Sequence, residues 1–591
     1  MNAPSSTSPR RPLPSARRRP GSLRRSAAPP ALLAALLLAA AGCDAGRDAG
    51  DEAPPPTSWG RGGDGAAAEA RPRVPEEERY GGTVVVAGPG DLLTMNPLIV
   101  ADRPSLEHQI HLLHITLVAE GPGAEPLPRL AESWSFDARG DRVTFRLRDD
   151  VRWHDGHPVT ARDVAFTWER AIDPAVPFAN PAYFDAWEAA EVLDEHTIRF
   201  TVRPRAHLLY GWMRTAILPE HILGDVPPEE LERHPFGTTE PVGAGPFRFL
   251  RRVPGDRWVF EANPDFPEAL GGRPYVDRYV YRQIPDGAVA EAELKRGRVH
   301  LLLDVTPDAA ARLAADTAVA VAGFAAPEYA FIAWNTRRPP LTDPAVRRAL
   351  TLAIDREGIR EVVRGPYGRV LAGPVGRWHP AFDSTLAPLP FAPDSARTLL
   401  AAAGWTDSDG DGIRDRDGRS FQFDLLHTPR DDWAQVAAIA QANLRDVGVE
   451  VSTRVREQAA LVPLVTGPDR RFDAFLVGWV RDVMLDDRDM FACDRPTSPF
   501  QFTGWCRPEL DALLDSLQLV VGPDVQARLV ARYGRMVAEA QPYTFLYDVE
   551  SVLARRRELR GVRPDARAAI LGAAEWWLEP RARGDRAESR R

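Results

Sequence analysis

The sequence predicts an α/β fold, because patterns typical of helices and of strands alternate along much of the 591-residue chain. Residues 331–334 are a short apolar run of the kind that forms a buried strand, and a helical pattern follows at 344–354. Residues 441–451 again combine a helix and a strand, with Gly448 between them. A chain of this length can form two or more domains, each with its own hydrophobic core.

The charge and the single lysine narrow the range of functions. The formal net charge of −9 gives no indication of a nucleic-acid partner. The only lysine is Lys295, which lies in the polar run ELKRGR without a glycine-rich loop. A phosphate-binding loop or a Schiff-base enzyme would need a lysine in a different setting, so both are set aside.

The N-terminus has the pattern of an exported protein. Arginines cluster within the first 26 residues, and residues 27–41 are then almost wholly apolar. A basic segment followed by a short apolar run is typical of a secretory signal and is short for a membrane-spanning helix. The run ends in AAGC at residues 40–43, which resembles the lipobox of bacterial lipoproteins. We therefore expect a signal peptide at 1–42 and an acylated Cys43; an ordinary signal peptide with an incidental cysteine is the alternative.

Residues 43–79 predict a disordered linker. Apart from Trp59 the segment consists largely of Gly, Ala, Pro, Asp, Glu and Arg, a composition that cannot bury enough apolar surface to offset chain entropy. We expect no folded structure before Tyr80.

The folded chain is expected to open with a buried strand at residues 80–86, followed by a helix at 105–121. This helix carries His108, His111 and His114. Histidines three residues apart can share a metal ion, so a nickel or haem site is one interpretation. A partly buried helix without a metal is the other, because the third histidine has rotated off the face of the first.

Residues 143–151 predict a half-buried strand, since apolar and polar side chains alternate along it. A turn follows at 153–158, and Thr160 with Asp163 predicts a capping box at the start of the next helix. The turn contains His154 and His157 in an HxxH spacing. We interpret these two histidines as polar turn residues and not as metal ligands.

The helix at 344–354 has clear signals at its start and along one face. Asp343 is a good N-cap, and Pro344 occupies the first helical position, where its missing N–H costs nothing. The apolar stripe that should face a core consists of Val346, Ala349, Leu350, Ala353 and Ile354.

An acidic loop follows a second predicted helix, which starts at Pro393 and which Gly404 is placed to end. The loop has the spacing of a calcium-binding EF-hand at Asp407, Asp409, Asp411 and Asp415. Its twelfth position is Gly418 instead of glutamate, so the strongest ligand is missing. A structural calcium ion and a solvated acidic turn are both open interpretations, and no cofactor is required.

Several stretches resemble the family 5 extracellular solute-binding proteins, the peptide and nickel receptors of ABC importers, in their dipeptide- and oligopeptide-binding branch. The resemblance covers residues 80–580, nearly all of the chain expected to fold. The motifs that carry it are GGT with the later NP at 81–97, LPRLAESW at 127–134, FRLRDDVRWHDGHPVTARDVAF at 145–166, ILPEHIL at 217–223, PVGAGPF at 241–247 and the segment 331–355.

The resemblance implies a two-lobed, type II periplasmic-binding-protein (Venus-flytrap) fold with an additional small subdomain. In this arrangement a ligand is enclosed between two lobes by hinge closure. We expect lobe I at 80–118, 204–325 and 542–583, the extra subdomain at 119–203, and lobe II at 326–541.

The resemblance also implies where a ligand binds. Residues 479–482 are similar to a turn whose aspartate, in the peptide receptors of the family, forms a salt bridge with the α-ammonium of the bound peptide. Asp482 occupies that position, and an enclosed charge pair is screened little by water. Arg481 departs from the pattern: it either neutralises Asp482, as Arg488 also could, or receives a carboxylate. Trp479, Trp505 and Trp378 are candidate aromatic walls.

Cys493 and Cys506 are the only cysteines after Cys43. An even pair in an exported protein favours a disulfide, and receptors that resemble this chain show the same arrangement. Two free thiols are the alternative.

The function implied is that of a substrate-binding lipoprotein that takes a short peptide and delivers it to an ABC permease. We expect a monomer on the outer side of the cell membrane, held there by its lipid anchor alone. A receptor for a nickel chelate, haem or oligosaccharide is the rival within binding proteins, and a lipoprotein hydrolase is the rival from another class. No GxSxG, HExxH, CxxC or phosphate-loop motif supports an enzyme.

Overall fold

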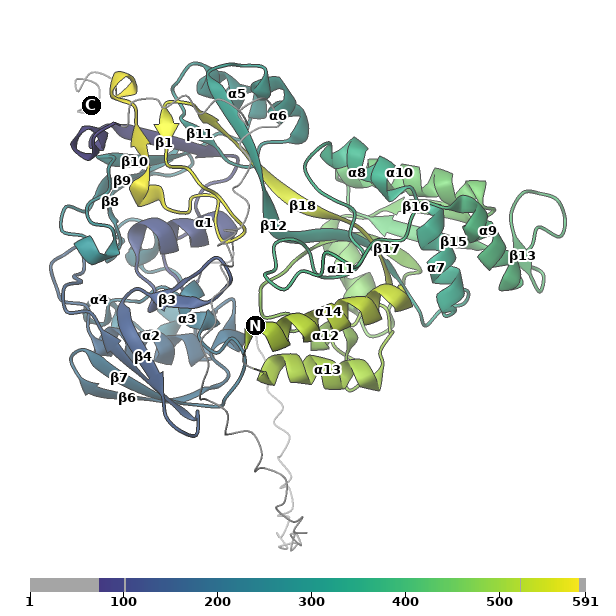
Figure 1. Cartoon of the computed structure of the whole chain (residues 1–591), viewed down its shortest axis with the longest axis horizontal. Helices are drawn as coiled ribbons and strands as arrows, with labels where there is room; N and C mark the ends of the chain where they lie inside the picture. Colours follow the sequence, from purple (N-terminus) through teal and green to yellow (C-terminus); the bar gives the residue numbers. More distant parts are fainter. Residues whose placement is uncertain (1–73, 100–101, 521, 584–591) are drawn as a thin grey trace, which may run out of the picture. The chain divides into compact units, whose positions relative to one another are not determined.

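The computed structural model describes residues 74–99, 102–520 and 522–583, and these are built around a ten-stranded mixed sheet (Figure 1). The order of the strands is β16-β15-β17-β12-β18-β11-β1-β10-β9-β8. Their bounds are β1 Thr83–Gly88, β8 Phe247–Val253, β9 Arg257–Ala262, β10 Arg278–Gln283, β11 Leu301–Leu302, β12 Val319–Trp334, β15 Gln422–His427, β16 Glu450–Val455, β17 Ala474–Val480 and β18 Tyr543–Arg556. The predicted α/β class is confirmed. The predicted signal peptide and Cys43 lie outside the described residues.

Two long strands, β12 and β18, join the two sides of this sheet. They run antiparallel, with Val319 opposite Arg556 and Ala333 opposite Tyr543. On one side β18 pairs with β11, which leads through β1 to β10. On the other side β12 pairs with β17, which leads through β15 to β16. The sheet therefore runs without a break through both expected lobes, and the predicted domain boundaries stay a prediction.

The second half of β12 separates two hydrophobic cores. Ala330, Ile332 and Trp334 are buried in one core, and the intervening Tyr329, Phe331 and Ala333 are buried in the other. This alternation follows from the period of two along a strand. The first core is completed by α7 Pro344–Ala353, α8 Arg356–Arg364, α9 Pro393–Ala402 and α10 Asp431–Asp446; the second is completed by α11 Gln458–Thr466, α12 Arg488–Phe491, α13 Pro508–Leu519 and α14 Pro523–Ala540.

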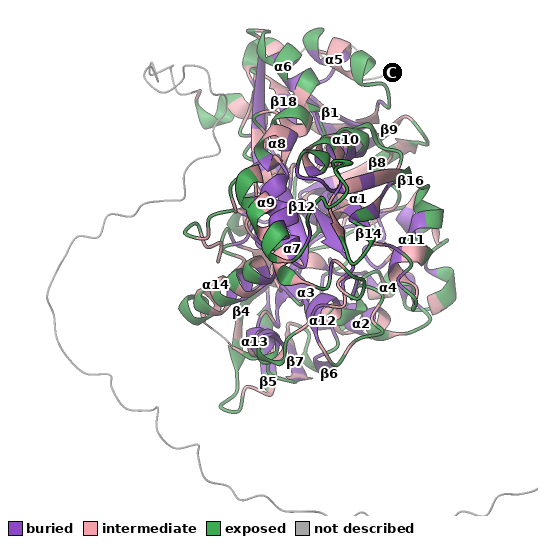
Figure 2. Ribbon diagram, turned by 90° about the vertical axis from the view of Figure 1, so that its right-hand side faces the viewer, coloured by how far each residue is buried: buried purple, intermediate pink, exposed green. Residues whose placement is uncertain are grey.

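Figure 2 shows buried residues along the strands and on the inner faces of the helices, with exposed residues on the outer faces. The predicted helix ends explain how two of these helices are placed. The carboxylate of Asp343 accepts a hydrogen bond from the backbone N–H of Ala345 at the start of α7 (2.8 Å). At the end of α9, Gly404 has φ of +84°, and the N–H of Trp405 reaches back to the carbonyl of Leu400 (2.9 Å).

The β1 side of the sheet is covered by shorter helices. These are α1 Arg103–His108, α5 Gly287–Lys295 and α6 Pro307–Ala314. Leu313 of α6 and Leu294 of α5 are buried in a core with Val319 and Val321 of β12. The small sheets outside the main one pair β2 Val118–Glu120 with β3 Pro126–Pro128, β13 Asp415–Arg416 with β14 Arg419–Ser420, and β19 Leu559–Arg560 with β20 Trp577–Leu578.

A separate four-stranded sheet, in the order β4-β5-β7-β6, has its own hydrophobic core. Its elements are β4 Ala131–Phe136, β5 Arg142–Leu147, β6 Trp187–Asp194, β7 Thr197–Val202, α2 Ala161–Ile172, α3 Tyr210–Arg214 and α4 Glu220–Leu223. Val143, Phe145 and Leu147 face this core, as the alternation predicts. The predicted capping box of Thr160 and Asp163 is present at the start of α2.

Two expectations near the start of the folded chain are wrong. The helix expected at 105–121 ends as α1 and one π-helical turn at Gln109–Leu113, after which the chain forms β2. The reason is tertiary: the Leu113 carbonyl accepts a hydrogen bond from the N–H of Gly245 (2.8 Å), and β2 pairs with β3. Structure also begins before Tyr80, because Glu76–Arg79 form a 3₁₀ turn. A hydrogen bond from the Tyr275 hydroxyl to Glu76 (3.2 Å) attaches this turn.

Candidate functional site

The candidate site is the loop at residues 481–487, which follows the C-terminal end of β17. Buried residues dominate the first half of β17, and the strand ends at Val480, which is 69% exposed. The N–H of Arg481 then donates to the carbonyl of Pro327 in β12 (2.6 Å). A proline has no N–H to give to a sheet, and here it lies where the register of β12 against β18 shifts. The start of the loop is therefore fixed to β12.

Arg481 and Asp487 form a buried ion pair across this loop, with their side chains 7% and 0% exposed. The hydroxyl of Tyr533 donates to the second carboxylate oxygen of Asp487. Burial lowers the pKa of Arg481, but the charge of Asp487, its hydrogen bond to Arg481 and the nearby Tyr329 and Tyr533 together outweigh burial and raise that pKa. Arg481 therefore stays charged, and its charge is matched by Asp487.

The two other acidic residues of the loop, Asp486 and Asp482, have different hydrogen-bond partners. Asp486 pairs with Arg488 through two hydrogen bonds of 2.9 and 2.7 Å near the surface. Asp482 accepts one hydrogen bond, from the N–H of Met484 (2.9 Å), and forms no ion pair among the described residues. The two arginines that the sequence offered as partners of Asp482 are thus paired elsewhere.

Burial raises the pKa of Asp482 above its ordinary value. The charges of Arg481 and Arg214 and the hydrogen bond from Met484 lower it in part, and Asp487 raises it further. Asp482 is half-buried as a residue. A partly desolvated carboxylate without a counter-ion favours a cationic ligand group.

Tyr183, Tyr210 and Arg214 interact electrostatically with this carboxylate. They belong to the core of the four-stranded sheet β4-β5-β7-β6 or flank it, and this part of the chain is called the small-sheet domain below. Burial raises the pKa of Tyr183, and the charge of Asp482 raises it further. Arg214 pairs with Glu120 (3.3 Å), and both side chains are more than four-fifths buried. Burial would lower the pKa of Arg214, whereas the surrounding Tyr210, Glu120 and Tyr183 raise it. Asp482 of one part of the chain thus shares its electrostatic environment with residues more than 250 positions away.

Comparison with known proteins identifies the family of the chain. The family model described as "Bacterial extracellular solute-binding proteins, family 5 Middle" matches residues 125–498. The chain belongs to this family. Its members are extracellular or periplasmic binding proteins of transporters.

Relatives of this solute-binding protein extend over most of its length. The oligopeptide-binding protein AppA of Bacillus subtilis (strain 168) is 29% identical over 508 residues, which cover 85% of this chain and 92% of AppA. The di/tripeptide-binding protein 2 of Pseudomonas aeruginosa is 27% identical over 483 residues, covering 77% and 87% of the two chains.

Solved structures give the same fold. The B. subtilis AppA structure in complex with a nonapeptide has a TM-score of 0.68 at 28% identity and covers 85% of this chain and 99% of its own. NikZ from Campylobacter jejuni in complex with Ni(L-His) has a TM-score of 0.68 at 23% identity and covers 84% and 99%. The two-lobed fold predicted for this solute-binding protein is confirmed.

The three predicted aromatic walls are placed unequally. Trp479 is half-buried, and its ring lies 5.4 Å from that of Phe500 and 5.7 Å from that of Phe502. Trp505 and Trp378 are only 9% and 7% exposed and belong to the core beneath the loop. Trp479 therefore has the most surface to offer a ligand, and ligand contact by all three stays a prediction.

A disulfide links Cys493 and Cys506, whose Cα atoms are 5.2 Å apart. It closes the segment that follows α12, and the N–H of Cys493 donates to the carboxylate of Asp511 in α13 (3.1 Å). The predicted pairing is present, and it anchors the chain next to the candidate loop.

The three histidines considered as metal ligands, His108, His111 and His114, have different surroundings and do not converge on one point. His108 contacts the hydroxyl of Tyr279 (3.0 Å), whereas His114 contacts the carbonyl of Met95 (2.8 Å). Burial lowers the pKa of both histidines to about 4, so they are neutral at pH 7. His111 lies elsewhere, among Arg129, Arg214 and Arg567, whose charges add to burial in lowering its pKa.

In the acidic loop, ligand oxygens of Asp407, Asp409 and Asp411 lie within 4.8 Å of one another. Asp415 instead accepts hydrogen bonds from the hydroxyl (2.7 Å) and N–H (2.9 Å) of Ser408. Three of the four predicted ligands are thus brought together, and calcium binding stays a prediction.

Nothing in the sequence singled out the residues that face Asp482. Tyr183, Tyr210 and Arg214 carry no motif, and their electrostatic interaction with Asp482 arises only through the tertiary fold. In the part of the chain that the structure describes, no helix is both long and apolar enough to cross a membrane.

The two neighbouring aspartates of the loop should differ sharply in their effect on stability. Asp487→Asn leaves the charge of Arg481 buried without a partner, which typically costs about 3–5 kcal/mol of the free energy of unfolding. Asp486→Asn is the matched control and should cost less than about 1 kcal/mol, because its ion pair with Arg488 lies near the surface. Urea unfolding of both variants at pH 7 measures the difference, and equal losses would contradict the buried pair.

Proposed function

We propose that this protein binds a short peptide at Asp482 and delivers it to an ABC permease. The observation that carries the proposal is the half-buried carboxylate of Asp482, which has no ion-pair partner among the described residues. Membership of the family supports it, as do relatives named as oligopeptide- and di/tripeptide-binding proteins.

A peptide α-ammonium matches this carboxylate in charge and in hydrogen bonding. The ammonium has three N–H donors, and Asp482 has carboxylate lone pairs beyond the one that accepts from Met484. A charge-assisted hydrogen bond in a partly desolvated site is stronger than one in water. The ligand would thus supply the counter-ion that the fold leaves out.

A cationic group near His111 suggests a direction for the peptide. Around His111 lie the three arginines Arg129, Arg214 and Arg567, whereas the nearby carboxylates are Glu120 and Asp565. The Nε–H of Arg129 is buried without an acceptor, and burial lowers the pKa of this arginine to about 10. We place the backbone carbonyls or the carboxylate of the peptide towards this cationic group.

Attachment to the membrane is a separate part of the proposal. It rests on the AAGC sequence at residues 40–43, outside the described residues, and on the extracellular or periplasmic character of the family. An acylated Cys43 followed by a long polar tether would hold the binding domain near a permease.

The decisive variant is Asp482→Asn, which keeps the size of the side chain and removes its charge. If Asp482 binds the α-ammonium, removing one partner of the enclosed pair costs about 3–5 kcal/mol. That loss weakens peptide binding by roughly two to three orders of magnitude, at about 1.4 kcal/mol per tenfold. Calorimetric titration of one peptide in free and N-acetylated forms measures it. The wild type should prefer the free form, and the variant should discriminate far less.

Asp486→Asn provides the matched control, because it removes a carboxylate from the same loop whose charge is already paired with Arg488. This variant should bind both forms of the peptide as the wild type does. An unchanged preference for the free form in Asp482→Asn would remove Asp482 from the binding site. Turnover of the peptide by pure protein would instead favour the hydrolase.

Peptide binding should also depend on pH in a way that reports on Asp482. Its pKa in the folded protein is raised above the ordinary 3.8, so the ionised form costs stability once the pH exceeds that value. As the pH falls through the raised pKa, Asp482 becomes protonated and peptide affinity should decline, at a higher pH than for an ordinary aspartate. The ligand-free Asp482→Asn variant should melt at a higher temperature than the wild type near neutral pH.

Titration calorimetry across the acidic range and differential scanning calorimetry measure these two effects. In Asp482→Asn the decline attributable to this group should disappear. The same acidic decline in both proteins would show that another group controls it.

A further inference from the structure

Two histidines and an aspartate meet on the surface of the small-sheet domain. One ligand atom each from Asp155, His157 and His221 lies within 4.8 Å of the others. The two carboxylate oxygens of Asp155 are divided between the histidines: Oδ2 lies 2.8 Å from Nε2 of His221, and Oδ1 lies 3.2 Å from Nδ1 of His157. The two imidazole rings are stacked with their centroids 4.2 Å apart.

The turn that carries Asp155 and His157 is held by its own backbone. The N–H of Trp153 donates to the carbonyl of His157 (2.8 Å), and the N–H of Gly156 donates to the carbonyl of Trp153 (2.8 Å). Gly156 has φ of +97°, a conformation that other residues rarely adopt. The Asp-Gly step is thus what turns the chain so that residues 155 and 157 lie on one side.

His221 reaches this turn from α4, 66 residues away from Asp155. The start of α4 is fixed by the carboxylate of Asp163, which accepts a hydrogen bond from the N–H of Glu220 (2.9 Å). The other oxygen of Asp163 accepts from the N–H of Thr160 (2.8 Å) in the capping box of α2. One aspartate therefore sets the position of α4, which carries His221, relative to the start of α2.

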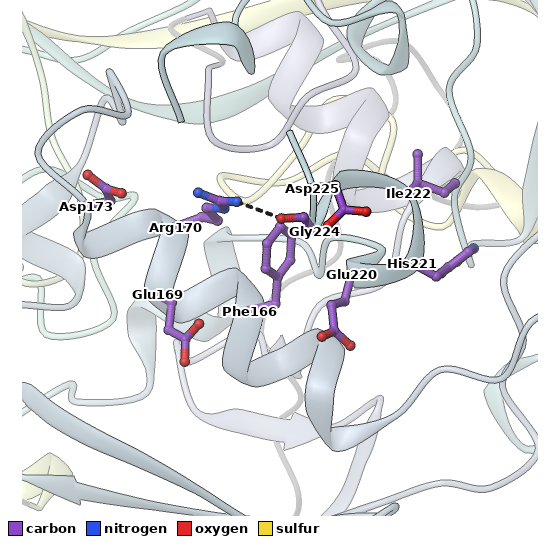
Figure 3. Close-up of a pocket in the computed structure, with 9 residues that line it drawn as sticks. All are labelled: Phe166, Glu169, Arg170, Asp173, Glu220, His221, Ile222, Gly224 and Asp225. Atoms are coloured by element: carbon purple, nitrogen blue, oxygen red, sulfur yellow. Dashed lines mark hydrogen bonds between the residues drawn. The ribbon is translucent and has the colours of Figure 1, made fainter. Parts of the chain in front are cut away.

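The chain beside His221 is acidic. A hollow of about 690 Å³ opens there, with His221 at the right and Asp173 at the left of the view in Figure 3. Its charged lining consists of four carboxylates, from Glu169, Asp173, Glu220 and Asp225, and one guanidinium, from Arg170. Arg170 is already engaged by the carbonyls of Gly224 (3.1 Å) and Val226 (3.0 Å). A surface concavity with an excess of negative charge raises the local concentration of cations.

We propose that Asp155, His157 and His221 bind a divalent transition-metal ion of the zinc class. For His157 this proposal replaces the interpretation from the sequence, in which it is only a polar turn residue. Two imidazole nitrogens and one carboxylate are a ligand set that Zn²⁺ takes, with water in the fourth position. Calcium and magnesium ions favour oxygen ligands throughout and do not match this set. In the bound state the metal holds the three groups together.

The acidic loop of Asp407, Asp409 and Asp411 differs in two respects and carries no such proposal. It has no nitrogen ligand, and its carboxylates accept hydrogen bonds from their own loop, including the N–H groups of Gly410, Asp411 and Ile413. It provides the control for non-specific attraction of cations.

Titration of the metal-free full-length protein with Zn²⁺ at neutral pH tests the proposal. Calorimetry should find a site with a stoichiometry of one that involves these residues. His157→Asn and His221→Asn should each weaken that site by at least about tenfold, and the double variant should lose it. Asp409→Asn should leave it unchanged. Because the side chain of His157 is 60% exposed, its replacement should not disturb folding, and the melting temperature without metal checks this.

Cobalt gives a second readout that does not depend on heat. Co²⁺ in a four- or five-coordinate site with histidine ligands absorbs visible light far more strongly than the hydrated ion, and this added absorption should vanish in the double variant while remaining in Asp409→Asn. Zinc binding weaker than about 1 mM, or binding that the double variant retains in full, would overturn the proposal.

Discussion

The antiparallel pairing of β12 with β18 is the constraint on which the rest of the structure depends. In the ten-stranded sheet of the described residues, these two strands link the two sides. One side is joined to β18 through β11, and the other is joined to β12 through β17. The pair also places the candidate site, because Arg481 is attached to Pro327 where the register of β12 shifts. The two long strands thus join the two sides of the sheet, and β12 also fixes the start of the loop that carries Asp482.

The loop itself depends on how its charges are allocated. In the core, Asp487 forms an ion pair with Arg481 and accepts a hydrogen bond from Tyr533. Near the surface, Asp486 forms an ion pair with Arg488. Among the described residues Asp482 has no ion-pair partner, and burial raises its pKa. A fold normally pairs its buried charges, so a half-buried carboxylate without a counter-ion is a feature that a ligand can complete. The departure from the family pattern at Arg481 is compatible with this, because that arginine has its own partner.

Local signals in the sequence predicted much of the fold, and contacts between distant residues account for what they missed. Asp343, the capping box of Thr160, and Gly404 act within one turn of a helix, so they could be read directly. The helix expected at 105–121 was wrong because the carbonyl of Leu113 accepts a hydrogen bond from the N–H of the distant Gly245. In the candidate site, the resemblance identified Asp482. The sequence did not indicate that Arg214 and Tyr183 lie near Asp482, or that His221 contacts Asp155, because these neighbours come together only when separate elements pack.

The central claim, that the natural ligand is a peptide with a free amino terminus, is tested most directly by native mass spectrometry. The protein would be purified under mild conditions from the organism that produces it, so that an enclosed ligand is retained. The account predicts added masses that fragmentation identifies as short peptides, each with an unmodified α-amino group. Added mass belonging to a haem, a nickel chelate or an oligosaccharide would contradict it.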